Sequence, residues 1–192
     1  MLFEDRRRDG TGRRCVDRIA EQGLTVFGDA RGFFFESFSV RDFEQATGIR
    51  TTFVQDNHSR SVRGVLRGLH YQMNPPQGKI VRVTGGTVWD VAVDLRRASP
   101  TFKKWVGVTL SDDNKRMLWI PPGFGHGFVV LSERVDFLYK TTAYYDQPSD
   151  RSLRWDDPAI GIQWPLQELR HAPVLSTKDQ NAPSFAQAEL FP

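Results

Sequence analysis

Two strand-like runs meet at a pair of glycines in the segment KIVRVTGGTVWDVAVDL, residues 79–95. Both runs are short and rich in β-branched residues, which favour strands. Paired glycines accept the positive φ angles of a primed turn, so the tetrapeptide TGGT at residues 84–87 is typical of a β-hairpin. We therefore expect the strands at 79–83 and 87–95 to be neighbours in one sheet.

The same pattern continues on both sides of this segment. Short β-branched or aromatic runs, separated by clusters of Gly, Pro or Asp, predict further strands at 51–55, 65–72, 105–110, 128–131 and 135–142. Strands spaced this closely indicate an antiparallel sandwich or barrel. Helical signals are few, and the candidates are residues 41–46 and 184–190. The predicted fold class is all-β, an antiparallel β-sandwich with a few short helices.

Length and composition favour one domain. A chain of 192 residues, 39% of them hydrophobic, can bury one well-formed core and is short for two. Residues 1–20 hold six arginines and four acidic residues, and we expect them to form a flexible N-terminal extension. Residues 21–192 are then a single domain whose charge is nearly balanced.

Charge and cysteine content argue against several classes of protein. The extension carries most of the net charge of +3, so the domain offers no basic stripe, and we expect no nucleic-acid partner. Residues 6–18 are polar, unlike an export signal, and no apolar run approaches the roughly 18 residues of a membrane span. The single cysteine, Cys15, cannot form an internal disulfide. We expect a cytoplasmic protein that does not bind membranes.

Metal binding is weakly supported by the histidine pattern. Small β-barrels that hold a metal often use two histidines separated by one residue, and no His-x-His pair occurs here. The four histidines lie far apart in the sequence, at His58, His70, His126 and His171. We therefore expect no metal site.

Other catalytic patterns are also absent. Asp90 and Asp94 share a strand face, but four residues of strand separate their Cα atoms by roughly 13–14 Å, too far for a glycosidase pair. We interpret both as structural or interface residues. There is no Gly-x-Ser-x-Gly elbow for a hydrolase, and GFGHG at residues 123–127 lacks the spacing of a dinucleotide-binding loop.

His70 is the strongest candidate for chemistry. It lies in RGLHYQ, residues 67–72, and a side chain that titrates near neutral pH is an unusual choice for packing alone in a strand. Removing a proton from carbon next to a ketone needs a base, a cation near the enolate oxygen, and an acid. His70 suits the first role and Lys79 the second. The candidates for the acid are Tyr139, Tyr144 and Tyr145.

Strand periodicity predicts which polar side chains meet. Residues two apart share a face, so Gln55 and Asn57 are expected to lie together. Strict alternation would put Arg67 and His70 on opposite faces. A bulge at Gly68 would bring both to the same side, and we predict such a bulge.

Nine motifs in order carry a resemblance that runs from about residue 22 to 183. They are DARGFFFE (29–36), QDN (55–57), GVLRGLHYQ (64–72), QGK (77–79), DVAVDLR (90–96), IPPGFGHGF (120–128), LYK (138–140), WDDP (155–158) and KD (178–179). In these motifs the chain resembles the dTDP-4-dehydrorhamnose 3,5-epimerases. The resemblance implies a cupin-like jelly-roll fold, a homodimer and a reaction that uses neither metal nor other cofactor.

The resemblance also implies catalytic roles. His70 falls at the position of the family's base, and Asp179 at the carboxylate that pairs with it. Tyr139 matches the proton donor on the opposite face of the sugar, and Lys79 would lie beside the enolate oxygen. The substrate would be a dTDP-4-keto-6-deoxyhexose, inverted at C3 and C5 to give dTDP-4-keto-L-rhamnose on the way to dTDP-L-rhamnose.

A further set of positions matches those that bind the nucleotide, diphosphate or sugar. They are Arg31, Glu36, Gln55, Asn57, Arg67, His126, Asp150 and Lys178. The segment around Arg31 and Glu36 would contribute to the partner's barrel. The chain departs from the family at Asp150, where Glu is usual, and at Gly125, where Ala is usual.

Two rival functions stay open at this point. One is a single-centre epimerase that inverts only C3 or only C5 of a dTDP-4-keto-6-deoxy sugar in natural-product sugar biosynthesis. The other is a non-catalytic or metal-binding cupin. Single-centre relatives can lack the His-Gly-Phe or Lys-Asp motif, and this chain retains both, which favours the double epimerase.

Overall fold

The computed structural model of the chain describes residues 20–22 and 25–192. The predicted extension, residues 1–20, lies outside the described residues except for Ala20, and so does Cys15. Among the described residues, no helix is long and apolar enough to cross a membrane.

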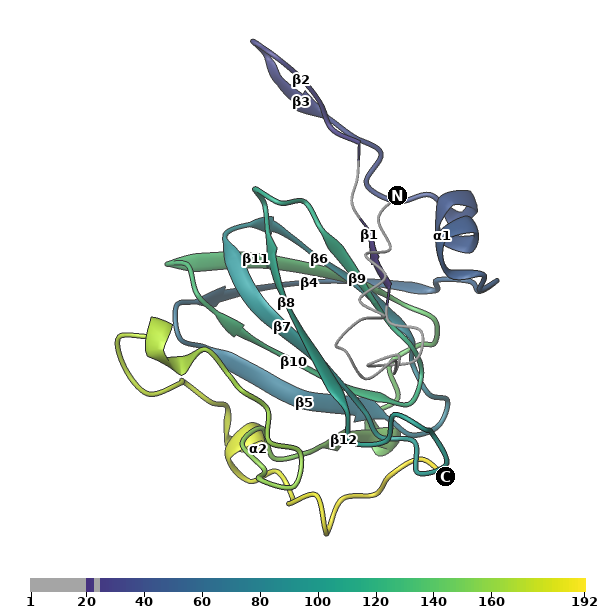
Figure 1. Cartoon of the computed structure of the whole chain (residues 1–192), viewed down its shortest axis with the longest axis vertical. Coiled ribbons are helices and arrows are strands. Elements are labelled where there is room, and N and C mark those ends of the chain that lie inside the picture. Colours follow the sequence, from purple (N-terminus) through teal and green to yellow (C-terminus); the bar gives the residue numbers. More distant parts are fainter. Residues whose placement is uncertain (1–19, 23–24) are drawn as a thin grey trace, which may run out of the picture.

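Two five-stranded sheets face each other (Figure 1). The first contains, in spatial order, β1 (Ala20–Gln22), β9 (Met117–Ile120), β6 (Lys79–Gly85), β11 (Arg134–Thr141) and β4 (Gln55–Val62). The second contains β12 (Asp150–Ser152), β5 (Leu66–Gln72), β10 (Phe124–Val130), β7 (Thr87–Asp94) and β8 (Trp105–Ser111). Every pairing between these strands is antiparallel. The architecture is a cupin-like jelly-roll sandwich, as predicted.

Few elements lie outside the two sheets. A separate two-stranded sheet pairs β2 (Phe27–Asp29) with β3 (Gly32–Phe34), and this hairpin projects away from the sandwich (Figure 1). The helical elements are α1 (Val40–Thr47), η1 (Gln147–Ser149), η2 (Leu166–Glu168) and α2 (Thr177–Gln180). The predicted helix at 41–46 is therefore confirmed as α1.

Local signals explain where α1 begins and ends. The Ser39 side chain accepts a hydrogen bond from the backbone N–H of Asp42, which satisfies an otherwise unpaired helix donor. Gly48 takes a left-handed φ of 69° and donates its N–H to the Glu44 carbonyl, which ends the helix.

The predicted hairpin at residues 84–87 is wrong. β6 pairs with β9 and β11, whereas β7 pairs with β8 and β10, so the two runs belong to different sheets. Gly86 has the expected positive φ, but its backbone lies so close to β11 that an added Cβ would be 2.0 Å from the Arg134 carbonyl. A turn signal specifies a local reversal of the chain and leaves the hydrogen-bonded partners open. Here the chain crosses between sheets, and Val83 and Val88 pack in the same core cluster.

Two other local predictions also need correction, and some short strands were missed. The run 51–55 is not a strand, because β4 begins only at Gln55 and Phe53 packs against Phe43 of α1 instead. Residues 184–190 form turns rather than a helix, and their apolar side chains cover the second sheet. The short strands β9 and β12 were not predicted.

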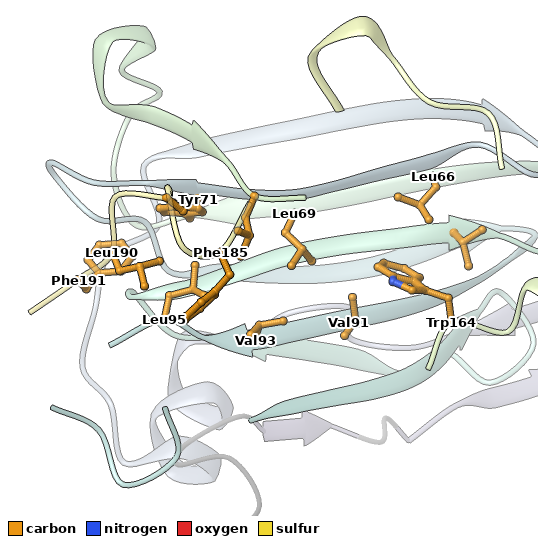
Figure 2. Close-up of a cluster of buried hydrophobic side chains, with 13 residues drawn as sticks. Leu66, Leu69, Tyr71, Val91, Val93, Leu95, Trp164, Phe185, Leu190 and Phe191 are labelled. Carbon is orange, nitrogen blue, oxygen red and sulfur yellow. The ribbon is translucent and has the colours of Figure 1, made fainter. Parts of the chain in front are cut away.

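Buried side chains form three layers around the sheets. One cluster lies between them and includes Val81 and Phe137 from the first sheet and Val88 and Phe128 from the second. A second covers the outer face of the second sheet, where β5 and β7 side chains meet the C-terminal segment (Figure 2). The third joins α1 to the first sheet through Phe43. Both sheets are thereby fixed on their outer sides.

Candidate functional site

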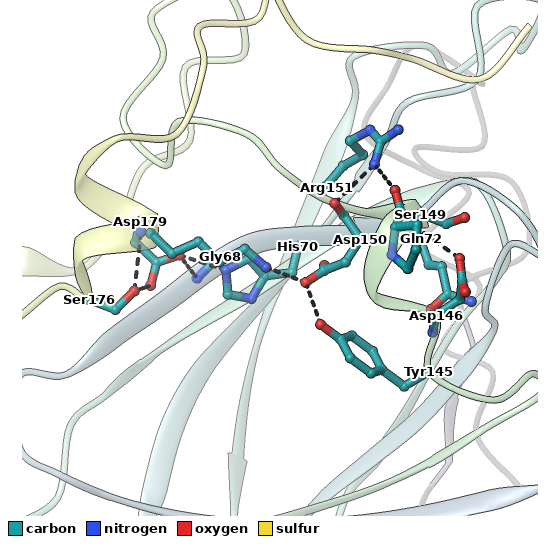
Figure 3. Close-up of polar contacts among 12 residues, drawn as sticks. Gly68, His70, Gln72, Tyr145, Asp146, Ser149, Asp150, Arg151, Ser176 and Asp179 are labelled. Atoms are coloured by element: carbon teal, nitrogen blue, oxygen red, sulfur yellow. Dashed lines mark hydrogen bonds and ion pairs between the residues drawn. The ribbon is translucent and has the colours of Figure 1, made fainter.

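His70 forms a hydrogen-bonded pair with Asp179. Its Nε2 lies 2.6 Å from Asp179 Oδ1, and the carboxylate side chain is only 2% exposed (Figure 3). His70 comes from β5 and Asp179 from α2, so the pair joins residues 109 positions apart. One ring nitrogen of His70 is thus occupied by the carboxylate, which leaves the other to act on a substrate.

Asp179 stays ionised through its hydrogen bonds. Burial alone would raise its pKa, but hydrogen bonds from His70 and Ser176 outweigh that effect and hold the pKa below its ordinary value. The Ser176 hydroxyl donates to Oδ2 at 2.7 Å, and the Gly68 N–H approaches Oδ1 at 3.4 Å. A fixed negative charge beside His70 favours the protonated ring once a proton has been taken up.

A second histidine–carboxylate pair lies on β10 and β7, next to β5 in the same sheet. His126 Nε2 is 2.9 Å from Asp90 Oδ2, and both side chains are buried. His126 on β10 is the direct register partner of His70 on β5. Burial raises the pKa of Asp90, against the opposing effects of His126 and Lys79. The two histidines therefore lie side by side, each with its own carboxylate.

Tyr139 and Lys79 lie on the opposite sheet. Tyr139 of β11 packs against the core cluster between the sheets, and burial raises the pKa of its phenol. Arg67 of β5 is close enough to oppose that shift, which indicates that Tyr139 faces the second sheet. Burial lowers the pKa of Lys79 to about 8, although Asp150 and Asp90 act to raise it. The Lys79 backbone is paired within the first sheet, but its ammonium group has no hydrogen bond or ion pair with any residue that the structure describes.

Gly68 forms the predicted bulge. Arg67 pairs with Phe128 while His70 pairs with His126, so β5 has one more residue than β10 between these positions. Gly68 has φ +123°, and a Cβ there would be 2.6 Å from Gly127 Cα. Leu66 and Leu69 pack on the outer side of the sheet, which leaves Arg67 and His70 on the inner side. The prediction that both share a face is confirmed.

Further polar residues lie near the side chains of His70, His126, Tyr139 and Lys79. Gln55 Nε2 donates to Asn57 Oδ1 at 2.9 Å, which confirms that the two amides share a face. Arg67 donates from Nε and Nη2 to the Ser61 hydroxyl of the first sheet, at 3.1 and 3.0 Å. This bond links β5 to β4 across the sandwich.

Asp150 is the centre of a network at one end of the sheets. It forms an ion pair with Lys178 and accepts a hydrogen bond from the Tyr145 hydroxyl at 3.1 Å (Figure 3). The Tyr145 N–H donates to Gln55 Oε1, so the network continues into β4. Beside it lies a pocket of about 540 Å³ that includes Tyr144 and Tyr145 in its lining.

Arg31 and Glu36 are not brought to this site within one chain. Arg31 follows β2 at the tip of the projecting hairpin, where it forms an ion pair with Asp29. Glu36 is exposed and follows β3. The remaining predicted residues come together, namely His70, Lys79, Gln55, Asn57, Arg67, His126, Tyr139, Asp150, Lys178 and Asp179.

Sequence reasoning missed or misassigned three residues of this site. Asp90 was interpreted as structural, yet it holds His126, whereas Asp94 does have the expected structural role with Arg96. Ser61 and Ser176 were missed because serines are common on strands and loops, whereas Tyr145, a candidate acid from the sequence, donates its hydroxyl to Asp150 instead. The Asp90 motif already contained the signal, since a buried aspartate in a strand needs a partner.

The described residues offer no cluster suited to a metal ion. Among the described residues, no group of three or more His, Cys, Asp or Glu side chains is arranged so that it could hold a metal ion. Each site histidine is hydrogen-bonded to a carboxylate, so the donors act in pairs. The arrangement supplies a base, a phenol and cations, which suits proton transfer at carbon.

Known proteins resemble this chain closely. The model of the dTDP-4-dehydrorhamnose 3,5-epimerase family matches residues 16–187. A dTDP-4-dehydrorhamnose 3,5-epimerase of Pseudomonas aeruginosa is 61% identical over 87% of this chain and 91% of its own length. One from Shigella flexneri is 56% identical over 86% and 90%.

A solved structure agrees with the fold. The dTDP-6-deoxy-D-glucose-3,5-epimerase of Legionella pneumophila Philadelphia 1, in complex with dTDP-4-keto-L-rhamnose, is 50% identical. It superposes with a TM-score of 0.87 and covers 91% of each chain. Both the sequence and the fold are therefore similar over nearly the whole chain.

Proposed function

This chain belongs to the dTDP-4-dehydrorhamnose 3,5-epimerase family, and from that premise we propose which of its residues carry the reaction. The chain is an isomerase that converts dTDP-4-keto-6-deoxy-D-glucose to dTDP-4-keto-L-rhamnose, a step in dTDP-L-rhamnose biosynthesis. Each inversion removes a proton from one face of a sugar carbon and returns one to the other face. The site therefore needs a base and an acid on opposite sides of the substrate.

The placement of His70 and Tyr139 carries the proposal. His70 belongs to the second sheet and Tyr139 to the first, so a sugar between the sheets has one group on each side. His70 removes the proton while Asp179 stabilises the resulting imidazolium. Tyr139, whose raised pKa keeps the phenol protonated near neutral pH, returns a proton from the opposite face.

Lys79 stabilises the negative charge that develops on the C4 oxygen. Proton removal at C3 or C5 places that charge on the former ketone, and an ammonium group lowers the barrier most where water is excluded. Lys79 is partly buried and has no ion-pair partner among the described residues, so its charge is free to act on substrate.

The surrounding polar residues hold the nucleotide and sugar. Arginine suits the forked contacts of a diphosphate, which we assign to Arg67, and Lys178 adds a second cation. His126 and the amides of Gln55 and Asn57 bind sugar or base oxygens. Asp150, held between Lys178 and Tyr145, accepts hydrogen bonds from the nucleotide.

We propose a homodimer in which the β2–β3 hairpin of one protomer completes the site of its partner. Phe27, Phe33 and Phe34 on the hairpin are 63%, 64% and 71% exposed, which is a large apolar area for an isolated chain. Arg31 at the tip would then reach the diphosphate of the substrate bound in the partner's site, and Glu36 would contact the same substrate.

The proposed chemistry needs no cofactor, and we place the enzyme in the cytoplasm. Activity is expected to survive exhaustive dialysis against a chelator, because base, acid and cation are all side chains. Loss of activity that returns with one added metal would contradict this and favour a metal-binding cupin. Cell fractionation tests the location.

Deuterium incorporation tests the proposal directly. Purified protein is incubated with dTDP-4-keto-6-deoxy-D-glucose in deuterium oxide, and label at C3 and C5 is measured by NMR. We expect label at both carbons, lost in His70→Ala, because a general base contributes about 10²- to 10⁴-fold. Label at one carbon would indicate a single-centre epimerase.

Tyr139→Phe separates the acid from the base. This variant keeps His70 and Asp179, so it should still exchange a carbon proton with solvent while product with the inverted configuration falls sharply. If Tyr139→Phe inverts both carbons at the parent rate, Tyr139 is not the proton donor.

A further inference from the structure

Ser176 makes two hydrogen bonds to one residue, Asp179. Its Oγ accepts from the Asp179 backbone N–H at 3.1 Å and donates to the Asp179 carboxylate Oδ2 at 2.7 Å. The first bond caps the N-terminus of α2, a helix of only four residues. The second has no part in the helix.

The carboxylate of Asp179 is fixed by donors from separate segments. His70 of β5 is bonded to Oδ1, the bulge N–H of Gly68 approaches the same oxygen, and Ser176 holds Oδ2. A carboxylate can rotate about its terminal bond, and a hydrogen bond to one oxygen sets where the other points. Since the side chain is 2% exposed, water does not substitute easily for a lost donor.

We propose that Ser176 is a positioning residue for proton abstraction, which holds the Asp179 carboxylate in the orientation that keeps His70 ready to act as base. This inference rests on the proposed roles of His70 and Asp179. The hydrogen bonds of the Ser176 hydroxyl in the described part of the chain both go to Asp179, and neither goes to the His70 ring. Its effect on catalysis therefore passes entirely through Asp179.

Removal of the hydroxyl should change both rate and pH dependence. In Ser176→Ala we expect kcat to fall about tenfold, because a hydrogen bond to a charged group is lost. KM should stay within about twofold, since substrate binding does not use this bond. A carboxylate with fewer donors attracts the imidazolium more strongly, so the acidic limb of kcat/KM should move to higher pH.

Ser39→Ala is the matched control. Ser39 caps α1 through the same bond to a backbone N–H, far from the site (Figure 1). It has no hydrogen bond to a catalytic side chain. Both variants should lose similar thermal stability, but only Ser176→Ala should lose kcat and shift the acidic limb.

Two further variants keep the test decisive. Ser176→Thr retains the hydroxyl and should restore the parent pH profile. Ser176→Gly lacks it but is tolerated at a helix cap, so it replaces Ser176→Ala if that protein does not fold. Parent-like kcat and pH profile in Ser176→Gly or Ser176→Ala would overturn the inference. Activity retained in His70→Ala and Asp179→Asn would instead overturn the proposed function.

Discussion

His70 and His126 are neighbours of the same residue type, and their carboxylates distinguish them. Asp179 has a lowered pKa because His70, Ser176 and Gly68 together outweigh its burial. Asp90 has a raised pKa because burial dominates over His126 and Lys79. A carboxylate whose charged form is favoured supports a base that must gain a proton. This difference favours His70 as the base and His126 as a group that binds substrate.

Lys79 predicts the alkaline side of the pH profile. In its proposed role the Lys79 ammonium must be charged to stabilise the enolate, and burial lowers its pKa to about 8. The charge is therefore present below that pH and is lost as the pH rises through it. We expect kcat/KM of the wild type to fall above about pH 8, measured from initial rates in overlapping buffers.

Lys79→Arg provides the comparison. Guanidinium stays charged throughout this range, so the variant should show no alkaline fall near pH 8, although its larger head lowers the maximum rate. Tyr139 does not interfere, because its pKa lies above the ordinary phenol value. An identical alkaline limb in both proteins would assign that limb to another group.

At the scale of elements, the close pairing of β5 and β10 sets the positions of the two site histidines. His70 and His126 are register partners, and next to them Gly68 and Gly127 bring the two backbones into contact. A Cβ at Gly127 would lie 2.7 Å from the Arg67 carbonyl and 3.3 Å from Gly68 Cα. Side chains there would force the strands apart and move both histidines.

Gly127→Ala should accordingly affect stability and rate together. We expect a loss of about 1–3 kcal/mol in the free energy of unfolding, as for other overpacked sites, and a lower kcat. Urea denaturation and steady-state kinetics measure the two effects. Gly125→Ala is the control on the same strand, where the nearest atom is the flexible Leu95 Cδ1 at 3.0 Å. Equal stability of the two variants would contradict the argument.

Elements were easier to predict than their partners. The runs that became β5, β6, β7, β8 and β11 were identified from β-branched and aromatic residues alone. The glycine pair at 85–86 correctly indicated a turn, but the strands on its two sides do not pair with each other. A turn between two strands of one sheet and a turn that crosses between two sheets can have the same local sequence pattern. The apolar runs at 51–55 and 184–190 pack against other elements, and tertiary packing overrides a local preference of that kind.

At the scale of the whole molecule, the projecting hairpin predicts a shared active site. If Arg31 serves the partner's site, each active site takes His70 from one protomer and Arg31 from the other. An Arg31→Ala protomer and a His70→Ala protomer therefore lack different components of the shared site. In a mixed dimer, one of the two active sites contains both an intact His70 and an intact Arg31. Random re-association of equal amounts should therefore restore about a quarter of wild-type activity, since half of the dimers are mixed and each has one intact site.

The alternative is distinguishable in the same experiment. If each chain uses its own Arg31, no mixed dimer has an intact site and activity stays at the level of the single variants. A monomeric mass by sedimentation velocity would contradict the dimer itself. A mixture of His70→Ala with Tyr139→Phe is the negative control, because each chain then has a defect within its own sheets and no mixed dimer should contain an intact site.

The sequence alone determined the strand-rich class, the short helix α1 and, through its motifs, the family, and the same motifs contain the residues that we propose as catalytic. These features depend on local side-chain preference or on residue identity, both of which are written along the chain. Only the tertiary structure decided that β6 and β7 lie in different sheets, that Asp90 holds His126, and that Ser176 fixes the carboxylate beside His70. Each of these depends on which distant segments pack together, because a buried polar group takes its partner from whatever the fold places within hydrogen-bond distance.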